Sequence, residues 1–186
     1  MIILQLLFWF VELTLVLGIF SYCLYITGLF LSRFFEVPYV PTGRETIEKV
    51  FSYIHPTKDM KILELGCGNG RVLCSAVKRY GAHGKGVDMN PVFIFFARIR
   101  ARLMGISKNV EFISGNAWET DWSSTDVIYL FMIPAFLNAP RFLQKIGDEA
   151  RSGTYIVSHW FEIEHIRSKE VHKIHSGQHV TYVYRI

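Results

Sequence analysis

Apolar residues are concentrated at the start of this chain of 186 residues. Residues 1–31 are almost continuously apolar, and the stretch from Leu13 to Leu31 has the length of about 20 residues that a helix needs to cross a bilayer. A secretory signal peptide begins with basic residues, whereas no Lys or Arg precedes Arg33. The pattern therefore predicts one transmembrane helix, over residues 1–32, that stays attached to the chain.

After residue 44, short apolar segments alternate with segments of helical periodicity. Strands are expected at the start of 61–70 and at 85–88, 110–114, 126–131 and 154–158, with helices at 71–80, 91–104 and about 135–146. Residues 170–175 and 179–185 alternate polar and apolar positions, as in an antiparallel hairpin. This order predicts an α/β fold with a doubly wound, mostly parallel, Rossmann-like sheet and a C-terminal antiparallel hairpin. The predicted domains are a transmembrane helix (1–32), a linker (33–44) and one folded domain (45–186).

Charge adds little to the prediction of function. The formal net charge is +4, but no module that combines aromatic and basic residues for nucleic-acid binding is present. Three arginines, Arg98, Arg100 and Arg102, lie on the helix predicted at 91–104 and are expected on its solvent face. Anionic lipid headgroups are an equal explanation for a basic domain tethered to a membrane. The residues expected to form the buried stripe of this helix are Val92, Phe93, Phe96, Ile99 and Leu103.

Cysteine and histidine usage predicts neither disulfides nor a metal site. Cys23, Cys67 and Cys74 are an odd number without paired spacing, which favours a reducing compartment. The seven histidines are scattered, and no pattern of Cys or carboxylate residues completes a ligand set.

A glycine-rich loop follows the strand that begins at Lys61. Gly66, Gly68 and Gly70 let the backbone turn sharply and approach a ligand closely, and their spacing differs from the Gly-x-Gly-x-x-Gly of dinucleotide folds. About twenty residues later the next strand ends at Asp88, the position at which α/β cofactor folds bind ribose hydroxyls. Asp88 has an alternative role as a helix cap, although Asn90, directly before Pro91, suits that role better.

The sequence Glu-x-Gly-x-Gly-x-Gly from Glu64 resembles motif I of class I S-adenosylmethionine-dependent methyltransferases. More specifically, the chain resembles the membrane-anchored protein-lysine methyltransferases of mitochondria, which modify the ATP synthase c subunit and the adenine nucleotide translocase, and their prokaryotic relatives. The matching segments are Pro38 to Thr42, Glu64 to Arg71, Asp88 with Asn90 and Pro91, Arg98 to Ala101, Asn116 to Trp118, and Ile133 with Pro134. The chain departs from that family at Asn69, at Asn116 and over residues 158–161, so the substrate pocket is expected to differ.

The resemblance implies S-adenosyl-L-methionine as cofactor and a lysine of an integral membrane protein as acceptor, with no nucleic acid or metal as partner. It implies that the cofactor is bound by Thr42, Glu64, Gly66, Cys67, Gly68, Gly70, Asp88, Met89, Asn116 and Ala117. The acceptor pocket is expected to involve Tyr39, Trp118, Pro134, His159 and Phe161. No general base is identified; Glu119 and Asp121 are candidates that helix or turn roles explain equally well.

Rival functions and the location stay open at this point. A methyltransferase of a lipid or small membrane-partitioning molecule would use the same anchor, and a membrane-bound assembly factor without catalysis would keep the same fold. A nicotinamide-binding module is disfavoured by the glycine spacing. Arg33, Arg44 and Lys49 follow the apolar segment, so the positive-inside rule predicts a single-pass protein with its domain in the cytoplasm or mitochondrial matrix. The short chain favours a prokaryotic membrane.

Overall fold

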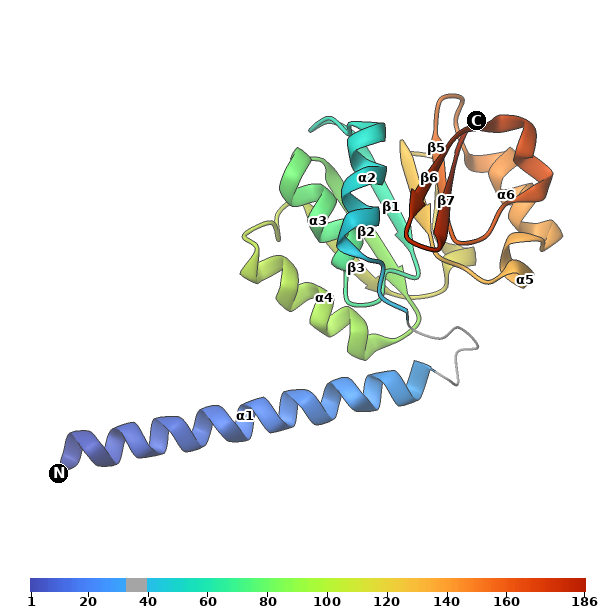
Figure 1. Cartoon of the computed structure of the whole chain (residues 1–186). Helices are drawn as coiled ribbons and strands as arrows, with labels where there is room; N and C mark the ends of the chain where they lie inside the picture. Colours follow the sequence, from blue (N-terminus) through green and yellow to red (C-terminus); the bar gives the residue numbers. More distant parts are fainter. Residues whose placement is uncertain (33–39) are drawn as a thin grey trace. The chain divides into compact units, whose positions relative to one another are not determined.

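The computed structural model describes residues 1–32 and 40–186, which form two separate units (Figure 1). The first unit contains the helix α1 (Ile2–Ser32), whose segment Ile2–Phe30 is long and apolar enough to cross a membrane. The predicted pocket residue Tyr39, the basic residue Arg33 and most of the predicted linker lie outside the described residues. The domain boundaries inferred from the sequence therefore stay a prediction.

The second unit is built on a seven-stranded sheet with the order β3-β2-β1-β4-β5-β7-β6. Its strands are β1 (Lys61–Leu65), β2 (His83–Asp88), β3 (Val110–Ser114), β4 (Val127–Leu130), β5 (Tyr155–His159), β6 (Glu170–Ser176) and β7 (His179–Arg185). The first five strands are parallel, whereas β7 pairs antiparallel with both β5 and β6. The Rossmann-like sheet with a C-terminal hairpin predicted from the sequence is confirmed.

Two hydrophobic cores cover the two faces of this sheet, because alternate residues of each strand point to opposite sides. The helices are α2 (Arg44–Ile54), α3 (Arg71–Tyr80), α4 (Pro91–Leu103), α5 (Pro134–Leu137) and α6 (Pro140–Glu149), with short 3-10 helices η2 (Ala117–Glu119) and η3 (Glu164–Lys169). Ile62 of β1 belongs to the core that contains residues of α2, α3 and α4, whereas Leu63 and Leu65 belong to the core that contains residues of α5 and α6.

Strand order reverses beside β1, and a ligand site is expected there, at the carboxyl edge of the sheet. The connection after β1 leads to β2 on one side, and β4 lies on the other side of β1. In open α/β sheets, ligands bind outside the carboxyl ends of the strands at such a reversal of strand order. The loops after β1, β2, β3, β4 and β5 all leave the sheet at this edge.

The structure divides one predicted helix and adds another. The helix expected at about 135–146 is two helices, because Pro140 starts α6 and holds the preceding Ala139 in an extended conformation. Helix α2 was not predicted, although Ile47, Val50, Phe51 and Ile54 have the spacing of an apolar helix face and are buried.

The buried face of α4 also differs from the prediction. The residues it buries are Phe93, Ile94, Ala97 and Ala101. Of the predicted stripe only Phe93 is buried, and Leu103 is 84% exposed. Small alanines face the sheet because they let the helix approach the strands closely, and most of the larger apolar side chains are left on the other face.

Candidate functional site

The loop between β1 and α3 is a tight turn that requires glycine. The backbone φ is +71° at Gly66, +50° at Gly68 and +70° at Gly70, in the left-handed region where residues with a β-carbon are strained. At Gly70 a β-carbon would lie 2.7 Å from Cζ of Phe112. The N–H groups of Gly66 and Cys67 donate to the carbonyl of Val87 at 2.8 and 3.0 Å. The loop is therefore pinned to the end of β2.

Asp88 joins the end of β2 to this loop. Its Oδ2 accepts a hydrogen bond from the N–H of Gly68 at 2.7 Å, and its Oδ1 accepts one from Asn90 at 2.8 Å. Burial raises the pKa of Asp88, and the two N–H donors oppose that rise. Each carboxylate oxygen has a further lone pair beyond the one used here. Asn90 caps α4, since its Oδ1 accepts from the N–H of Val92 at 3.0 Å, as its position predicted.

Glu64 and Cys67 lie beneath the loop. Glu64 is 5% exposed, and its Oε2 accepts a hydrogen bond from the N–H of Leu73 in α3 at 3.0 Å. Burial raises its pKa well above the usual range, and burial likewise raises the pKa of the Cys67 thiol. Glu64 therefore fixes the first turn of α3 against β1. Cys67 acts as a small packing residue rather than as a nucleophile, which would need a lowered pKa.

Two arginines of α4 brace the site instead of only pointing to solvent. Nη2 of Arg98 donates to the carbonyl of Phe112 in β3 at 2.7 Å, and Nε of Arg100 donates to the carbonyl of Asn69 in the glycine loop at 2.9 Å. Arg98 is exposed, as expected of the solvent face, whereas Arg100 is only partly exposed, and both also donate to a backbone carbonyl. Oδ1 of Asn69 is buried and has no hydrogen-bond partner among the described residues. A ligand with a donor group would satisfy this oxygen.

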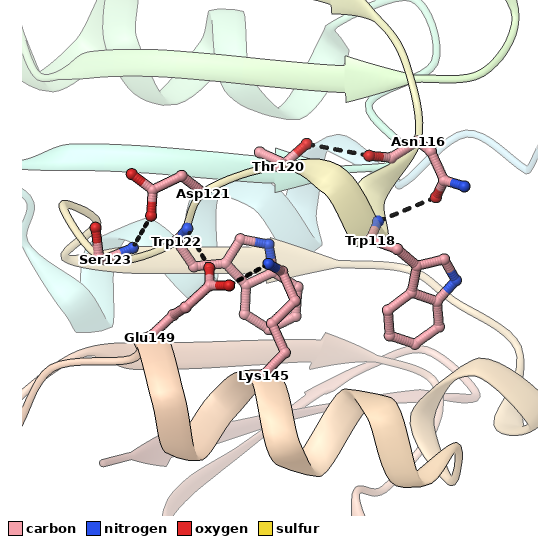
Figure 2. Close-up of polar contacts among 8 residues, drawn as sticks. All are labelled: Asn116, Trp118, Thr120, Asp121, Trp122, Ser123, Lys145 and Glu149. Atoms are coloured by element: carbon pink, nitrogen blue, oxygen red, sulfur yellow. Dashed lines mark hydrogen bonds and ion pairs between the residues drawn. The ribbon is translucent and has the colours of Figure 1, made fainter.

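The loop after β3 approaches the same edge. The N–H of Gly115 donates to the carbonyl of Asp88 at 3.0 Å, which ties this loop to β2. Oδ1 of Asn116 accepts from the N–H of Trp118 at 3.0 Å and starts the 3-10 helix η2, in which Ala117 is buried (Figure 2). Asp88 thus links the glycine loop to the loop that carries Asn116, whose amide oxygen has a structural role, and the predicted cofactor contact of Asn116 stays a prediction.

Trp118 is partly buried and packs against residues of α5 and α6. It stacks on Phe136 with ring centroids 4.0 Å apart, and the guanidinium of Arg141 lies 5.4 Å from its ring centroid.

Of the two candidate bases, Asp121 accepts a hydrogen bond from the N–H of Ser123 at 2.8 Å, which is a turn role (Figure 2). The Ser123 hydroxyl and, next, this N–H lower the pKa of Asp121.

Three further predicted residues differ in exposure. Thr42 is 6% exposed, and its hydroxyl lies 3.4 Å from the hydroxyl of Tyr129 in β4. Met89, directly after Asp88, is 48% exposed, so its side chain is available to a ligand. Pro134 starts α5 and is exposed.

An aromatic cluster lies at the carboxyl ends of β4 and β5. Phe131 follows β4, and its ring centroid lies 4.8 Å from that of His159 and 4.9 Å from that of Trp160. His179, at the start of the antiparallel β7, stacks on Trp160 at 4.2 Å. We call Phe131, His159, Trp160 and His179 the aromatic cluster. Of these four, the sequence indicated only His159. Phe131 and Trp160 directly follow the predicted strands, whereas His179 reaches this edge only through the antiparallel pairing of β5 with β7.

Trp160 has two unusual features. Its φ is +74°, a left-handed conformation that is rare for a bulky residue and marks local strain. Its Nε1 is buried and has no hydrogen-bond partner among the described residues. A strained backbone together with an unsatisfied buried donor is typical of a functional site rather than of a stable core.

His159 is neutral at physiological pH. It is 3% exposed, and its Nδ1 lies 2.7 Å from the hydroxyl of Thr181. Burial lowers its pKa to about 4, and the neighbouring His179 contributes to that lowering. The cluster therefore contains a buried, neutral imidazole together with three rings that are at least partly exposed, those of Phe131, Trp160 and His179. Phe161, also predicted, is half-buried beside Trp160, with ring centroids 6.4 Å apart.

The two halves of the site are neighbours in the sheet. The glycine loop follows β1, and the aromatic cluster follows β4 and β5, so about 10 Å of sheet separates β1 from β5. One half offers the carboxylate of Asp88 and the amide oxygen of Asn69, which suit the hydroxyl and amino groups of a nucleotide-like ligand. The other half offers aromatic faces. Among residues 1–32 and 40–186, no three His, Cys, Asp or Glu side chains gather into a metal-binding group.

Comparisons with known proteins agree with this geometry. A family model described as the ANTKMT methyltransferase domain matches residues 64–170. A protein-lysine N-methyltransferase of Saccharolobus islandicus is 33% identical over 160 residues, which cover 81% of this chain and 94% of that protein. The lysine N-methyltransferase of the ATP synthase c subunit from Rattus norvegicus is 22% identical over 129 residues, or 69% of this chain and 58% of that protein, so the match spans under two thirds of that relative.

A solved structure matches most of the fold. It is that of an RNA methyltransferase from Salinibacter ruber in complex with S-adenosyl-L-homocysteine, with a TM-score of 0.73 and 25% identity. The match covers 79% of this chain and 94% of that one.

Proposed function

Because the chain belongs to the ANTKMT methyltransferase-domain family of S-adenosylmethionine-dependent protein-lysine N-methyltransferases, we propose that it methylates lysine side chains of an integral membrane protein. The observation that carries this proposal is the pairing, on one sheet edge, of a glycine loop bound to Asp88 with an aromatic cluster two strands away. The first suits the cofactor and the second suits a lysine side chain.

We assign cofactor binding to the residues around the glycine loop. When bound, S-adenosylmethionine supplies a methyl group carried on a positively charged sulfur. The free lone pairs of Asp88 suit ribose hydroxyls, and Oδ1 of Asn69 suits a ligand amino group. Met89 and Ala117 would flank the adenine ring, and Asn116 would hydrogen bond to it. Gly66, Gly68 and Gly70 supply the positive φ values of the tight turn at the cofactor, whereas Glu64, Cys67 and Thr42 support the site from buried positions.

We assign acceptor binding to the aromatic cluster with Phe161, Pro134 and Trp118 at its margin. A lysine nitrogen attacks only as a neutral amine, and its reference pKa is about 10.4. Burial among rings disfavours the charged ammonium and so helps it to release its proton. Neutral His159 does not repel an arriving ammonium, and the ring faces attract one weakly. Exclusion of water and alignment of the amine are then the main contributions of the chain to the reaction.

We further propose that α1 crosses a membrane and holds the domain at its surface. Length and composition of α1 support a span. Arg33, Arg44 and Lys49 follow α1 whereas no basic residue precedes it, which supports a cytoplasmic or matrix location for the domain. A prokaryotic membrane is favoured, since the chain matches 94% of the archaeal relative's length. Tethering raises the effective concentration of enzyme and membrane-bound substrate on one surface.

The test is methyl transfer from radiolabelled S-adenosylmethionine into membranes of a strain that lacks this protein. We expect label in a protein band, recovered as methylated lysine after hydrolysis, with wild type and with the surface control Asp59→Asn but not with Asp88→Asn. Label in the lipid fraction would instead indicate a lipid or small-molecule acceptor. Cofactor binding without any transfer would contradict an enzymatic role.

A further inference from the structure

Helix α4 carries a second apolar face that the domain core does not use. Val92, Phe95, Ile99 and Leu103 follow one another at spacings of three and four residues, which places them on one side of the helix. This side lies opposite the buried Phe93, Ile94, Ala97 and Ala101. Phe95 is 50% exposed and Leu103 is 84% exposed. Large apolar side chains in register on an exposed face mark an interaction surface.

Basic residues border this face. Arg98 and Arg102 lie three and seven residues after Phe95, so both are on the same side of the helix beside it. No Asp or Glu occurs from Pro91 to Asn109, and Lys108 follows the helix. Arg98 is held in place by its bond to the Phe112 carbonyl, while Arg102 is exposed in the last turn. The apolar face is thus bordered by positive charges, and the helix itself carries no acidic residue to neutralise them.

We propose that this face of α4 docks on an anionic lipid bilayer, with Phe95 and Leu103 in the interface and Arg98 and Arg102 at lipid headgroups. An apolar face bordered by Arg and Lys is the pattern of helices that lie in the plane of a membrane surface. The proposal rests on the proposed membrane attachment through α1. Only seven residues separate Ser32 from Val40, so a bilayer that holds α1 keeps the domain near its surface. A second copy of the chain suits this face less well, because two such faces would oppose their positive borders.

Docking along α4 would also orient the proposed active site. The helix begins shortly after Asp88, at the same sheet edge as the glycine loop. Met89 at this end is 48% exposed. A domain lying on α4 therefore has the cofactor edge beside the headgroup layer, where lysines that emerge from a membrane protein are found.

The test uses the full chain, inserted through α1 into vesicles. The substitution Cys23→Ser removes the exposed native thiol and leaves only the buried Cys67 and Cys74. Leu103→Cys is labelled with an environment-sensitive fluorophore, and the vesicles contain phosphatidylcholine alone or with phosphatidylglycerol. We expect a blue shift of the emission and quenching by nitroxide lipids in the phosphatidylglycerol vesicles, both reversed by Arg102→Glu. The matched control is Val171→Cys, 45% exposed on β6 at the opposite edge of the sheet, whose label should stay water-exposed.

Two outcomes would overturn the proposal. One is a label at position 103 that remains in water in both kinds of vesicle. The other is an emission shift that follows protein density and not lipid composition, which would indicate a second copy. Methyl transfer to a soluble lysine peptide is measured on the same samples. If methyl transfer persists but the lipid-dependent emission shift is missing, docking of α4 is rejected and the proposed function stands. If the emission shift is present but methyl transfer is missing, the proposed function is rejected and docking stands.

Discussion

The carboxylate of Asp88 accepts the N–H of Gly68 at 2.7 Å and so locks the glycine loop after β1 to the end of β2. The same side chain accepts the N–H of Asn90, directly before α4. One residue therefore fixes two segments of the proposed cofactor site and, with its remaining lone pairs, offers acceptors to a ligand.

Asp88→Asn should weaken S-adenosylmethionine binding. An amide group has one acceptor oxygen, so its NH₂ would face an N–H donor of Gly68 or Asn90. Loss of a hydrogen bond to a charged group costs about 1.5–3 kcal/mol, equivalent to roughly 10- to 100-fold in affinity. Calorimetric titration measures the change, and Asp59→Asn in an exposed turn is the control. Unchanged affinity in a folded Asp88→Asn protein would refute the assignment.

Gly70→Ala should destabilise the domain more than Gly105→Ala, although φ is +70° at both positions. Both substitutions force a β-carbon into the left-handed region, at about 1–2 kcal/mol. Only at Gly70 does the new carbon meet neighbours, 2.7 Å from Phe112 Cζ and 3.0 Å from Ala97 Cβ, which adds about 1–3 kcal/mol. Denaturant unfolding of the two variants measures the difference. Equal losses of unfolding free energy in the two variants would mean that the glycine loop accommodates the new β-carbon without strain.

His159 should make stability fall as the pH drops below neutrality. Its folded pKa is about 4, against about 6.5 in the unfolded chain, so between these values the unfolded state binds more protons. The contribution of His159 to the free energy of unfolding is present above pH 6.5 and is lost as the pH falls toward 4. The free energy of unfolding should therefore fall by about 1–2 kcal/mol between pH 7 and pH 5. Urea unfolding at both pH values should show a smaller loss for His159→Asn than for wild type. The same loss of stability in His159→Asn and in wild type would exclude His159 as the source of the pH dependence.

Trp160→Ala should raise the KM for a lysine peptide by about five- to tenfold, because a ring contact to the acceptor is worth roughly 1 kcal/mol. Affinity for S-adenosylmethionine should not change, since Trp160 is outside the glycine loop. Tyr53→Ala on α2, which removes another partly exposed ring, is the control. Initial rates at saturating cofactor separate KM from kcat. A variant with wild-type KM would place the acceptor elsewhere.

Removal of residues 2–32 should leave cofactor binding intact, because, of the residues that the structure describes, none from 1–32 belongs to either hydrophobic core. Methylation of membrane-embedded lysines should fall by at least roughly tenfold through the loss of effective concentration. Methylation of a soluble lysine peptide is the internal control and should persist. Equal activity of the truncated and full-length chains on membrane substrates would show that α1 does not serve as a tether.

Local signals in the sequence were enough for much of the fold and for half of the site. The helix α3 and the strand β3 have the predicted bounds, and the glycine loop and Asp88 meet as expected. These features depend on short-range rules: glycine is needed where φ is positive, and apolar runs of about five residues form buried strands. The parallel order of strands then brings their carboxyl ends to one edge.

Long-range packing decided the rest. Helix α4 has large apolar residues on two sides, and periodicity alone does not tell which side faces the sheet; the small Ala97 and Ala101 fit against the strands and turned Leu103 outward. Arg98 and Arg100 became braces because β3 and the glycine loop present carbonyls to them. The stacking of His179 on Trp160 depends on the antiparallel register of β5 and β7. The sequence by itself thus determined the strands, the glycine turn and the carboxylate at the end of β2, while the aromatic cluster and the exposed face of α4 required contacts between distant segments.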